Sequence, residues 1–423
     1  MLKHKIRKHT LAVTERISDL MSLLLRDEAI SGKFLVIAAG VALIIANTAW
    51  HDGFNNFWQQ HLYIGIGNFG ISETLKHWID EGLMAIFFLV IGLEVKREIV
   101  RGELSTWRAA SLPIVAAVGG MIFAVAIYMF INAGQPGFHG WGIPMTTDTA
   151  LALGVLALVS TRIPAALKVF LLAVMVVDDL TAIIAIAVFY NSDINVGPLL
   201  VGGVIVLLML GLQWARLMRL STFVILGVLL WIFVHASGVH ASIAGAVMGL
   251  AAPIVPRWRK ITKRAIAERL ERSLIPVTTF VIIPLFALAN TGVTFTSDAF
   301  SGGEAAKIGL GVVGGLLIGK SLGIVAGTWL VVKLGISGLP HGVRWGHITG
   351  VAMLAGIGFT LSIFIAELAF EGTPYTDTAK IAIFGASIVA ATVGLFILRL
   401  VPRHRDMLSE TADTAGQQFT VKQ

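Results

Sequence analysis

Residues 168–190 decide the fold, and they read KVFLLAVMVVDDLTAIIAIAVFY. After Lys168 the stretch is almost wholly apolar except for two adjacent carboxylates, Asp178 and Asp179, at its centre. A helix needs about 20 mostly apolar residues to cross the hydrocarbon core of a membrane. An ionisable side chain at the bilayer centre costs at least ~2.5–3.5 kcal/mol and therefore usually has a function. The stretch predicts a membrane-spanning helix that buries an acidic pair.

The composition of the whole chain extends this interpretation. Of 423 residues, 56% are hydrophobic and only 13% are charged, and the mean hydropathy is +0.83. A soluble domain carries about 25% charged residues. The 45 glycines suit close packing of membrane helices. We therefore expect an all-α polytopic membrane protein. About twelve transmembrane helices are predicted, near residues 33–50, 77–96, 109–132, 141–160, 165–190, 198–215, 220–236, 240–256, 274–293, 305–334, 346–369 and 379–400.

Charge in the short loops predicts the orientation. Lys and Arg gather in alternate loops, near residues 96–108, 162–168, 216–219, 257–272, 333–344 and 399–405. The intervening loops carry Asp52, Glu73, Asp193, Asp298, Glu304, Glu371 and Asp377 and few cations. Cytoplasmic loops are the basic ones, so both termini are predicted to be cytoplasmic. The expected units are a basic N-terminus at 1–32, a membrane domain at 33–402 and a tail at 403–423.

Two terminal and loop segments have alternative interpretations. Residues 1–32 include apolar positions at helical spacing, which predicts a surface helix, and a disordered basic tail is the alternative. The first long apolar run begins too late for a cleaved signal peptide. In the external loop 51–74, residues 62–71 alternate and turn on glycine and asparagine. This pattern predicts a small β-hairpin, with an irregular loop as the alternative.

Two predicted helices are broken. Residues 142–148 read GIPMTTD and residues 356–362 read GIGFTLS, which align as G-I-x-x-T. Interrupted spans in corresponding halves of a chain point to a transporter binding site at the membrane midplane. A match this short also arises by chance. Asp148 follows the first break and is predicted to bind a cation or neutralise helix ends, with a simple N-cap as the alternative.

The acidic pair has the chemistry of ion and proton exchange. Neighbouring helix positions point about 100° apart, so one carboxylate can face an ion while the other faces a partner. Burial and like charge both disfavour ionisation of two adjacent carboxyls, and the same oxygens hold either a proton or a cation. A structural hydrogen-bonded pair is the alternative.

Lys320 is the only cation within the predicted span 305–334, apart from those at its ends. It follows Gly319 in a series with glycine at every fourth position, 311, 315, 319, 323 and 327, which predicts a ridge for close helix packing. A buried lysine needs a carboxylate, and Asp178 or Asp148 can supply it. Snorkelling to the interface is the alternative.

A charged cluster is expected at the cytoplasmic end of the bundle, from Glu94, Arg97, Glu98, Glu268, Glu271 and Arg272. It is interpreted as a pH-sensing group or a solvated rim.

The net charge of +7 is spread over short loops and lacks the basic stripe of a nucleic-acid-binding protein. Because cysteine is absent, disulfides, thiolate metal sites and cysteine nucleophiles are excluded.

Other membrane functions fit less well. The chain has no Gly-Asp dipeptide, so the Gly-x-Gly-Asp motif of intramembrane aspartyl proteases is missing. A membrane prenyltransferase needs further carboxylates along the helix, and none follows the pair before Asp193. An organic-anion symporter of similar architecture would take up solute without exchanging protons. A passive channel would not need the buried lysine and aspartates.

Taken in order along the chain, these residues resemble the NhaA family of bacterial sodium/proton antiporters. The matching stretches are LMAIFF (83–88), GLEVKRE (92–98), TD (147–148), ALGVLAL (152–158), STRIP (160–164), DDL (178–180), SGVHA (237–241), PLFALAN (284–290), GK (319–320) and GIGFT (356–360). The resemblance runs from about residue 30 to about residue 400, and it is the ordered set rather than any one motif that is specific.

The resemblance implies a secondary transporter rather than an enzyme, without a cofactor, in the bacterial inner membrane. It implies electrogenic export of Na⁺ or Li⁺ in exchange for H⁺ by alternating access, serving pH and sodium homeostasis. Asp179 would be the principal ligand of Na⁺ and H⁺, with Asp178 beside it and paired to Lys320. Asp148 would compensate two crossed, broken helices, and Thr147 would lie near the ion path.

It further implies inverted repeats at about 109–190 and 305–400 and a homodimer helped by a periplasmic β-hairpin. Glu94, Glu271 and His240 would be candidates for a pH response. Arg272 and Ile275 stand where the family often has histidines, so the resemblance does not carry over the pH profile.

Overall fold

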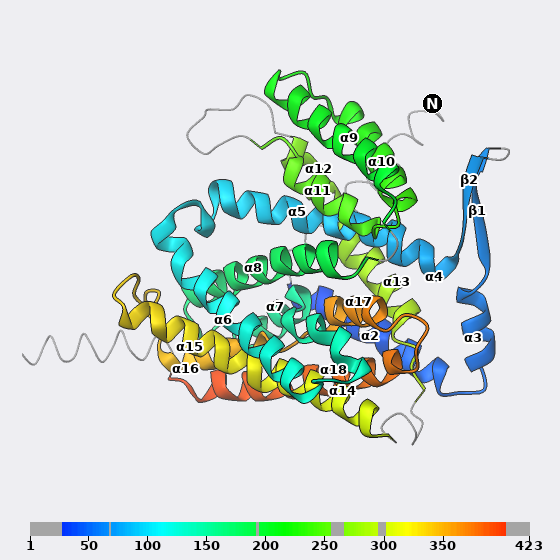
Figure 1. Ribbon diagram of the computed structural model, residues 1–423. Helices are drawn as coiled ribbons and strands as arrows, with labels where there is room; N and C mark the ends of the chain where they lie inside the picture. Colours follow the sequence, from blue (N-terminus) through cyan, green and yellow to red (C-terminus); the bar gives the residue numbers. More distant parts are fainter. Residues whose placement is uncertain (1–27, 67–68, 192–193, 255–265, 295–301, 403–423) are drawn as a thin grey trace, which may run out of the picture.

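The computed structural model describes residues 28–66, 69–191, 194–254, 266–294 and 302–402, and these are almost entirely helical (Figure 1). The helices are α2 (Glu28–Ala46), α3 (His51–Trp58), α4 (Leu75–His77), α5 (Met84–Arg101), α6 (Trp107–Ile131), α7 (Thr149–Ala157), α8 (Ala165–Phe189), α9 (Val196–Trp214), α10 (Leu220–Ala236), α11 (Ser242–Ala251), α12 (Ile266–Val277), α13 (Ile283–Asn290), α14 (Gly303–Val313), α15 (Lys320–Lys333), α16 (Trp345–Leu354), α17 (Phe359–Ala369) and α18 (Tyr375–Leu400). Short 3₁₀ or π-helical segments are η1 (Trp78–Leu83), η2 (Glu103–Ser105), η3 (Pro136–Met145), η4 (Thr278–Ile282) and η6 (Gly314–Gly319).

Six of the described helical segments are long and apolar enough to cross a membrane, and eight are if each of two bent pairs counts as one span. The bent pairs are 32–46 with α3, at 119°, and α16 with α17, at 45°. The apolar helices α10 and α11 are shorter. The polytopic, mostly helical architecture is as predicted, and the count of about twelve stays a prediction. Most of the expected N-terminal unit (1–27) and the tail (403–423) lie outside the described residues.

The loop between α3 and α4 contains a two-stranded antiparallel sheet, β1 (His61–Ile66) and β2 (Phe69–Thr74). Its register pairs His61 with Thr74 and Ile64 with Ile71. Of the two interpretations of residues 62–71, the described residues agree with paired strands rather than with an irregular loop. Figure 1 shows these strands and α3 together at one edge of the molecule.

The glycine ridge packs α15 and η6 against α6, as predicted. A Cβ at Gly327 would lie 2.5 Å from the Val115 carbonyl oxygen, and one at Gly323 would overlap the backbone of Gly119. Only the absence of a side chain lets two helix backbones approach this closely. Gly92 and Gly249 make a similar approach between α5 and α11.

Both predicted breaks are present. The first lies at Thr146–Asp148, which are non-helical between η3 and α7, and the second lies between α16 and α17. Pro144 has no backbone N–H and cannot continue a regular α-helix, and the segment before the first break is a 3₁₀ helix. The two broken segments cross within the apolar core, whose buried side chains include Ile143, Ile357 and Phe364.

Candidate functional site

Asp148 caps two helices at the crossing of the breaks. It is the N-cap of α7, and its Oδ1 accepts a hydrogen bond from the backbone N–H of Leu151 at 2.9 Å. Its Oδ2 accepts from both the backbone N–H and the hydroxyl of Thr360, at 3.0 and 2.6 Å, in the first turn of α17. Its own N–H donates to the Ile357 carbonyl at 2.6 Å. One carboxylate thus faces the positive ends of two helices, so both sequence interpretations of Asp148, as a cap and as a compensating charge, describe the same contact.

Lys320 is fully buried and reaches the same crossing from α15. Its Nζ lies 2.9 Å from Asp178 Oδ2 and donates to the Met145 carbonyl at 2.7 Å. The hydroxyl of Thr147 is also within hydrogen-bond distance of Asp178 Oδ2, at 2.7 Å, and of the Ala355 carbonyl, at 2.9 Å. The sequence left Asp178 and Asp148 as possible partners of Lys320, and in the structure Lys320 contacts Asp178.

Asp179 has a different environment from its neighbour. It is 4% exposed and lines a cavity of about 280 Å³ together with Asp148, Thr360 and Glu94. Among the described residues, no protein group hydrogen-bonds to its Oδ1. The two adjacent helix positions thus have different surroundings, since Asp178 pairs with a lysine whereas Asp179 lines a cavity.

The cavity extends from Asp179 to the charged end of α5, where it is lined by Glu94 and Arg97. Arg97 forms ion pairs with Glu271 of α12 and, at 3.5 Å, with Glu98. Thr278 and Thr279 also line this cavity. Glu94 and Glu271, which the sequence placed in one cluster, are thus at one end of the cavity.

His240 does not join this cluster. It lies in the turn between α10 and α11, where its Nδ1 is 2.8 Å from Glu81 Oε1. The other oxygen of Glu81 accepts from the backbone N–H groups of Ala241 and Ser242 at the start of α11. About 20 Å of helix separate Glu81 from Glu94. The three candidates for a pH response therefore form two separate groups, with Glu94 and Glu271 near Arg97 and His240 beside Glu81.

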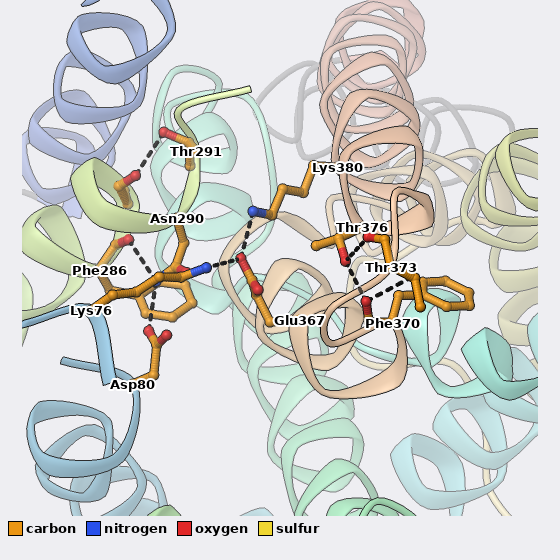
Figure 2. Close-up of polar contacts among 11 residues, drawn as sticks. Lys76, Asp80, Phe286, Asn290, Thr291, Glu367, Phe370, Thr373, Thr376 and Lys380 are labelled. Carbon is orange, nitrogen blue, oxygen red and sulfur yellow. Dashed lines mark hydrogen bonds and ion pairs between the residues drawn. The ribbon is translucent and has the colours of Figure 1, made fainter. Parts of the chain in front are cut away.

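A second ionic cluster joins the three helices α4, α17 and α18 away from the crossing (Figure 2). Glu367 of α17 lies between two lysines, with Oε1 2.8 Å from Lys76 Nζ and also paired with Lys380 of α18. Nearby, the side-chain amide of Asn290 donates to Asp80 Oδ1 at 2.6 Å. In Figure 2 the Lys76 and Lys380 side chains converge on Glu367 from different helices.

The sequence interpretation missed Asp80, Glu81 and Glu367. Asp80 and Glu81 stand inside the predicted span 77–96, and acidic residues at membrane depth are the signal that identified Asp178 and Asp179. Their place near the end of the span makes this signal weaker than it is for the central pair. Glu367 stands inside the predicted span 346–369 and carries the same signal, but its partner Lys76 is distant in the sequence, so only the fold brings the two together.

The crossed, interrupted helices with paired buried aspartates and a buried lysine define a class of secondary transporter. A family model described as Na+/H+ antiporter 1 matches residues 22–398. The chain belongs to this family and is a multi-pass membrane protein, a transporter and not an enzyme.

Individual relatives are similar over nearly their whole lengths. Na(+)/H(+) antiporter NhaA 2 of Clostridium beijerinckii is 42% identical, over 89% of this chain and 93% of its own. Na(+)/H(+) antiporter NhaA of Shewanella pealeana is 43% identical, over 89% of this chain and 96% of its own. The NhaA 3 antiporter of Frankia alni is 39% identical, over 92% and 90% of the two chains.

Proposed function

We propose that this chain exports Na⁺ or Li⁺ across the bacterial inner membrane in electrogenic exchange for H⁺, with Asp179 as the ligand that both ions share. Family membership supports sodium/proton exchange as the reaction. The observation that supports the site is the difference within the acidic pair: Lys320 forms an ion pair with Asp178, whereas Asp179 is the one of the two that lines the cavity.

The proposed exchange is competitive binding at one carboxyl. In the protonated state Asp179 is neutral and suits its buried position. When the proton leaves through the cavity, the carboxylate becomes an acceptor-only group and binds Na⁺, a hard cation that takes oxygen ligands. Oxygens of Thr147, Asp178 and Asp148 lie around the crossing and are proposed to complete or tune this site.

Alternating access is the proposed movement, and broken helices at a midplane site support it. The cavity reaches Asp179 from the end that carries Glu94 and Arg97. On another side of the crossing the rings of Phe88 and Phe364 pack with centroids 5.4 Å apart. If the Arg97 end is cytoplasmic, as the basic loops predict, this arrangement is open toward the cytoplasm.

The remaining features of the proposal rest on the sequence. These are about twelve transmembrane helices, cytoplasmic termini, inverted repeats at about 109–190 and 305–400, a homodimer aided by a periplasmic hairpin, and the absence of a cofactor. Glu94, Glu271 and His240 are retained as pH-response candidates. Because Glu94 and Glu271 lie near Arg97 whereas His240 lies beside Glu81, we propose that the two groups act separately.

The decisive experiment uses inside-out vesicles with a pre-formed pH gradient. Na⁺ and Li⁺, but not K⁺, should collapse the gradient in wild type. Asp179→Asn should abolish the effect, because an amide cannot exchange a proton for a cation. Asp377→Asn, an exposed aspartate at the start of α18, is the matched control and should behave as wild type.

Two results would overturn the proposal. Retention of full exchange by Asp179→Asn would remove the site assignment. Absence of Na⁺-driven dissipation in wild type, at every pH from mildly acidic to alkaline, would move the function toward a sodium-coupled solute carrier.

A further inference from the structure

Two histidines and a glutamate meet at the base of the β-hairpin, away from the crossing. They are Glu73 in β2, His77 in α4 and His235 in the last turn of α10. One potential ligand atom from each lies within 4.8 Å of those of the other two. All three residues are half-buried, so the group is both shaped by the fold and open to ions from solution.

The fold holds these side chains in place without a metal. Trp78, next to His77, stacks on Trp231, one helical turn before His235, with ring centroids 6.0 Å apart and planes 21° apart. Trp78 Nε1 donates to the Leu62 carbonyl, and Trp231 Nε1 donates to the Glu81 carbonyl, each at 2.9 Å. The two tryptophans therefore fix α4, the hairpin and the end of α10 to one another.

A local cap sets the spacing of Glu73 and His77. The backbone N–H of His77 donates to the Thr74 hydroxyl at 3.1 Å, which starts α4 directly after β2. This tight strand-to-helix turn brings the carboxylate of Glu73 back toward the imidazole of His77. The rings of His77 and His235 approach edge to face, with centroids 6.1 Å apart.

The three side chains are not used elsewhere in the described part of the chain. There, neither imidazole donates or accepts a side-chain hydrogen bond, and the Glu73 carboxylate makes no ion pair with a lysine or arginine. Two imidazoles and one carboxylate are the ligand set that zinc takes in three-ligand protein sites, where water completes the tetrahedron. Mg²⁺ and Ca²⁺ prefer oxygen ligands throughout.

We propose that Glu73, His77 and His235 form a binding site for a divalent transition-metal ion of the zinc type. Zn–N distances of about 2.0–2.1 Å require the three ligand atoms to close in slightly, which side-chain rotation provides. A bound ion links β2 and α4 to α10, so it ties the hairpin to the helical body. This site is separate from the Na⁺ site proposed at Asp179 and does not depend on it.

The test uses the full-length protein, purified in detergent with a tag that contains no histidine and stripped of metal with a chelator. Zn²⁺ binding is measured by titration calorimetry and by the metal retained after gel filtration. Co²⁺ provides a spectroscopic probe, since tetrahedral coordination gives intense visible bands. Wild type should bind one tight equivalent, and Zn²⁺ should raise the temperature of thermal unfolding.

Glu73→Gln, His77→Gln and His235→Gln should each weaken Zn²⁺ binding by about tenfold or more, the scale on which metal sites respond to loss of a coordinating or orienting group. His61→Gln is the matched control. His61 is exposed in the same hairpin and opposite Thr74, and since strand neighbours alternate between faces, it points away from the face of Glu73.

His4, His9 and His404 lie outside the described residues, and any Zn²⁺ that they bind remains in all variants as a background. The proposal is overturned if His77→Gln and His235→Gln bind Zn²⁺ as wild type does. It is equally overturned if wild type binds no tight equivalent, or if His61→Gln loses as much affinity as the three ligand variants. Sodium-driven proton exchange plays no part in these readouts.

Discussion

Lys320 and Asp178 form a buried ion pair at 2.9 Å, and this contact leaves the next residue in the chain, Asp179, to face the cavity. The ion pair connects α15 to α8, and the Thr147 hydroxyl, from the first break, also lies within hydrogen-bond distance of Asp178. The lysine thus has a structural role that can be separated from ion binding.

Replacing Lys320 with Gln should destabilise the protein more than it weakens Na⁺ binding. Removing one partner of a buried ion pair costs about 3–5 kcal/mol, because the other charge is left uncompensated. The double variant Lys320→Gln/Asp178→Asn should recover part of the lost unfolding temperature in a thermal melt. A double variant that unfolds earlier than Lys320→Gln alone would contradict this.

Replacing Glu367 with Gln should lower the unfolding temperature, because it leaves Lys76 and Lys380 close together without their carboxylate (Figure 2). The loss should be smaller than the roughly 3–5 kcal/mol of a fully buried pair, since the Lys76 side chain is 34% exposed. Adding Lys380→Met should restore stability in the same melt. If the double variant gains nothing, repulsion between the lysines is not the cause.

Gly323→Ala should disrupt the packing of α15 on α6. Its Cβ would overlap the backbone of Gly119 and Gly120, where no flexible side chain can move away. We expect a loss of more than about 1 kcal/mol, as for overpacking in other cores, measured as a lower unfolding temperature. Gly385→Ala, with open space around its Cβ in α18, is the control and should be neutral or slightly stabilising.

The pH dependence of stability should report His240, which lies in the turn at 237–241 outside α10 and α11. Burial by itself lowers the pKa of His240, but the hydrogen bond and charge of Glu81, with smaller contributions from the backbone of Tyr190 and the charge of Glu371, raise it above its usual 6.5. A histidine with a raised pKa in the folded state contributes stability at pH below its unfolded value. That contribution is lost as the pH rises through the folded value.

Wild type should therefore unfold at a higher temperature than His240→Gln at about pH 6. The difference between the two proteins should be smaller at about pH 9. Glu81→Gln, which keeps a side-chain carbonyl near the start of α11, should reduce the same pH dependence. A constant difference between wild type and His240→Gln at all pH values would contradict the role of the Glu81 charge.

Local patterns predicted much of this molecule. The apolar runs predicted a mostly helical membrane protein, the glycine at every fourth position predicted a surface for close helix packing, and the alternation of residues 62–71 predicted a hairpin, with an irregular loop as the alternative. These features depend on neighbours in the sequence or on a period along one helix. Asp178, Asp179 and Lys320 were identifiable because charge is rare at membrane depth.

The choice of partners could not be predicted in the same way. Lys320 had two possible carboxylates, and only the crossing of the broken helices decides for Asp178. His240 was grouped with Glu94 and Glu271 through the resemblance alone, and the length of α5 separates them. Glu367, Lys76 and Lys380 come from three helices, so no local pattern brings them together.

The two-sided cap at Asp148 has a mechanical consequence. Hydrogen bonds from Leu151 and Thr360 converge on one carboxylate, so α7 and α17 cannot separate while both are intact. Moving α7 away from α17 would therefore require at least one of these hydrogen bonds to break, so a single side chain links two distant stretches of the sequence.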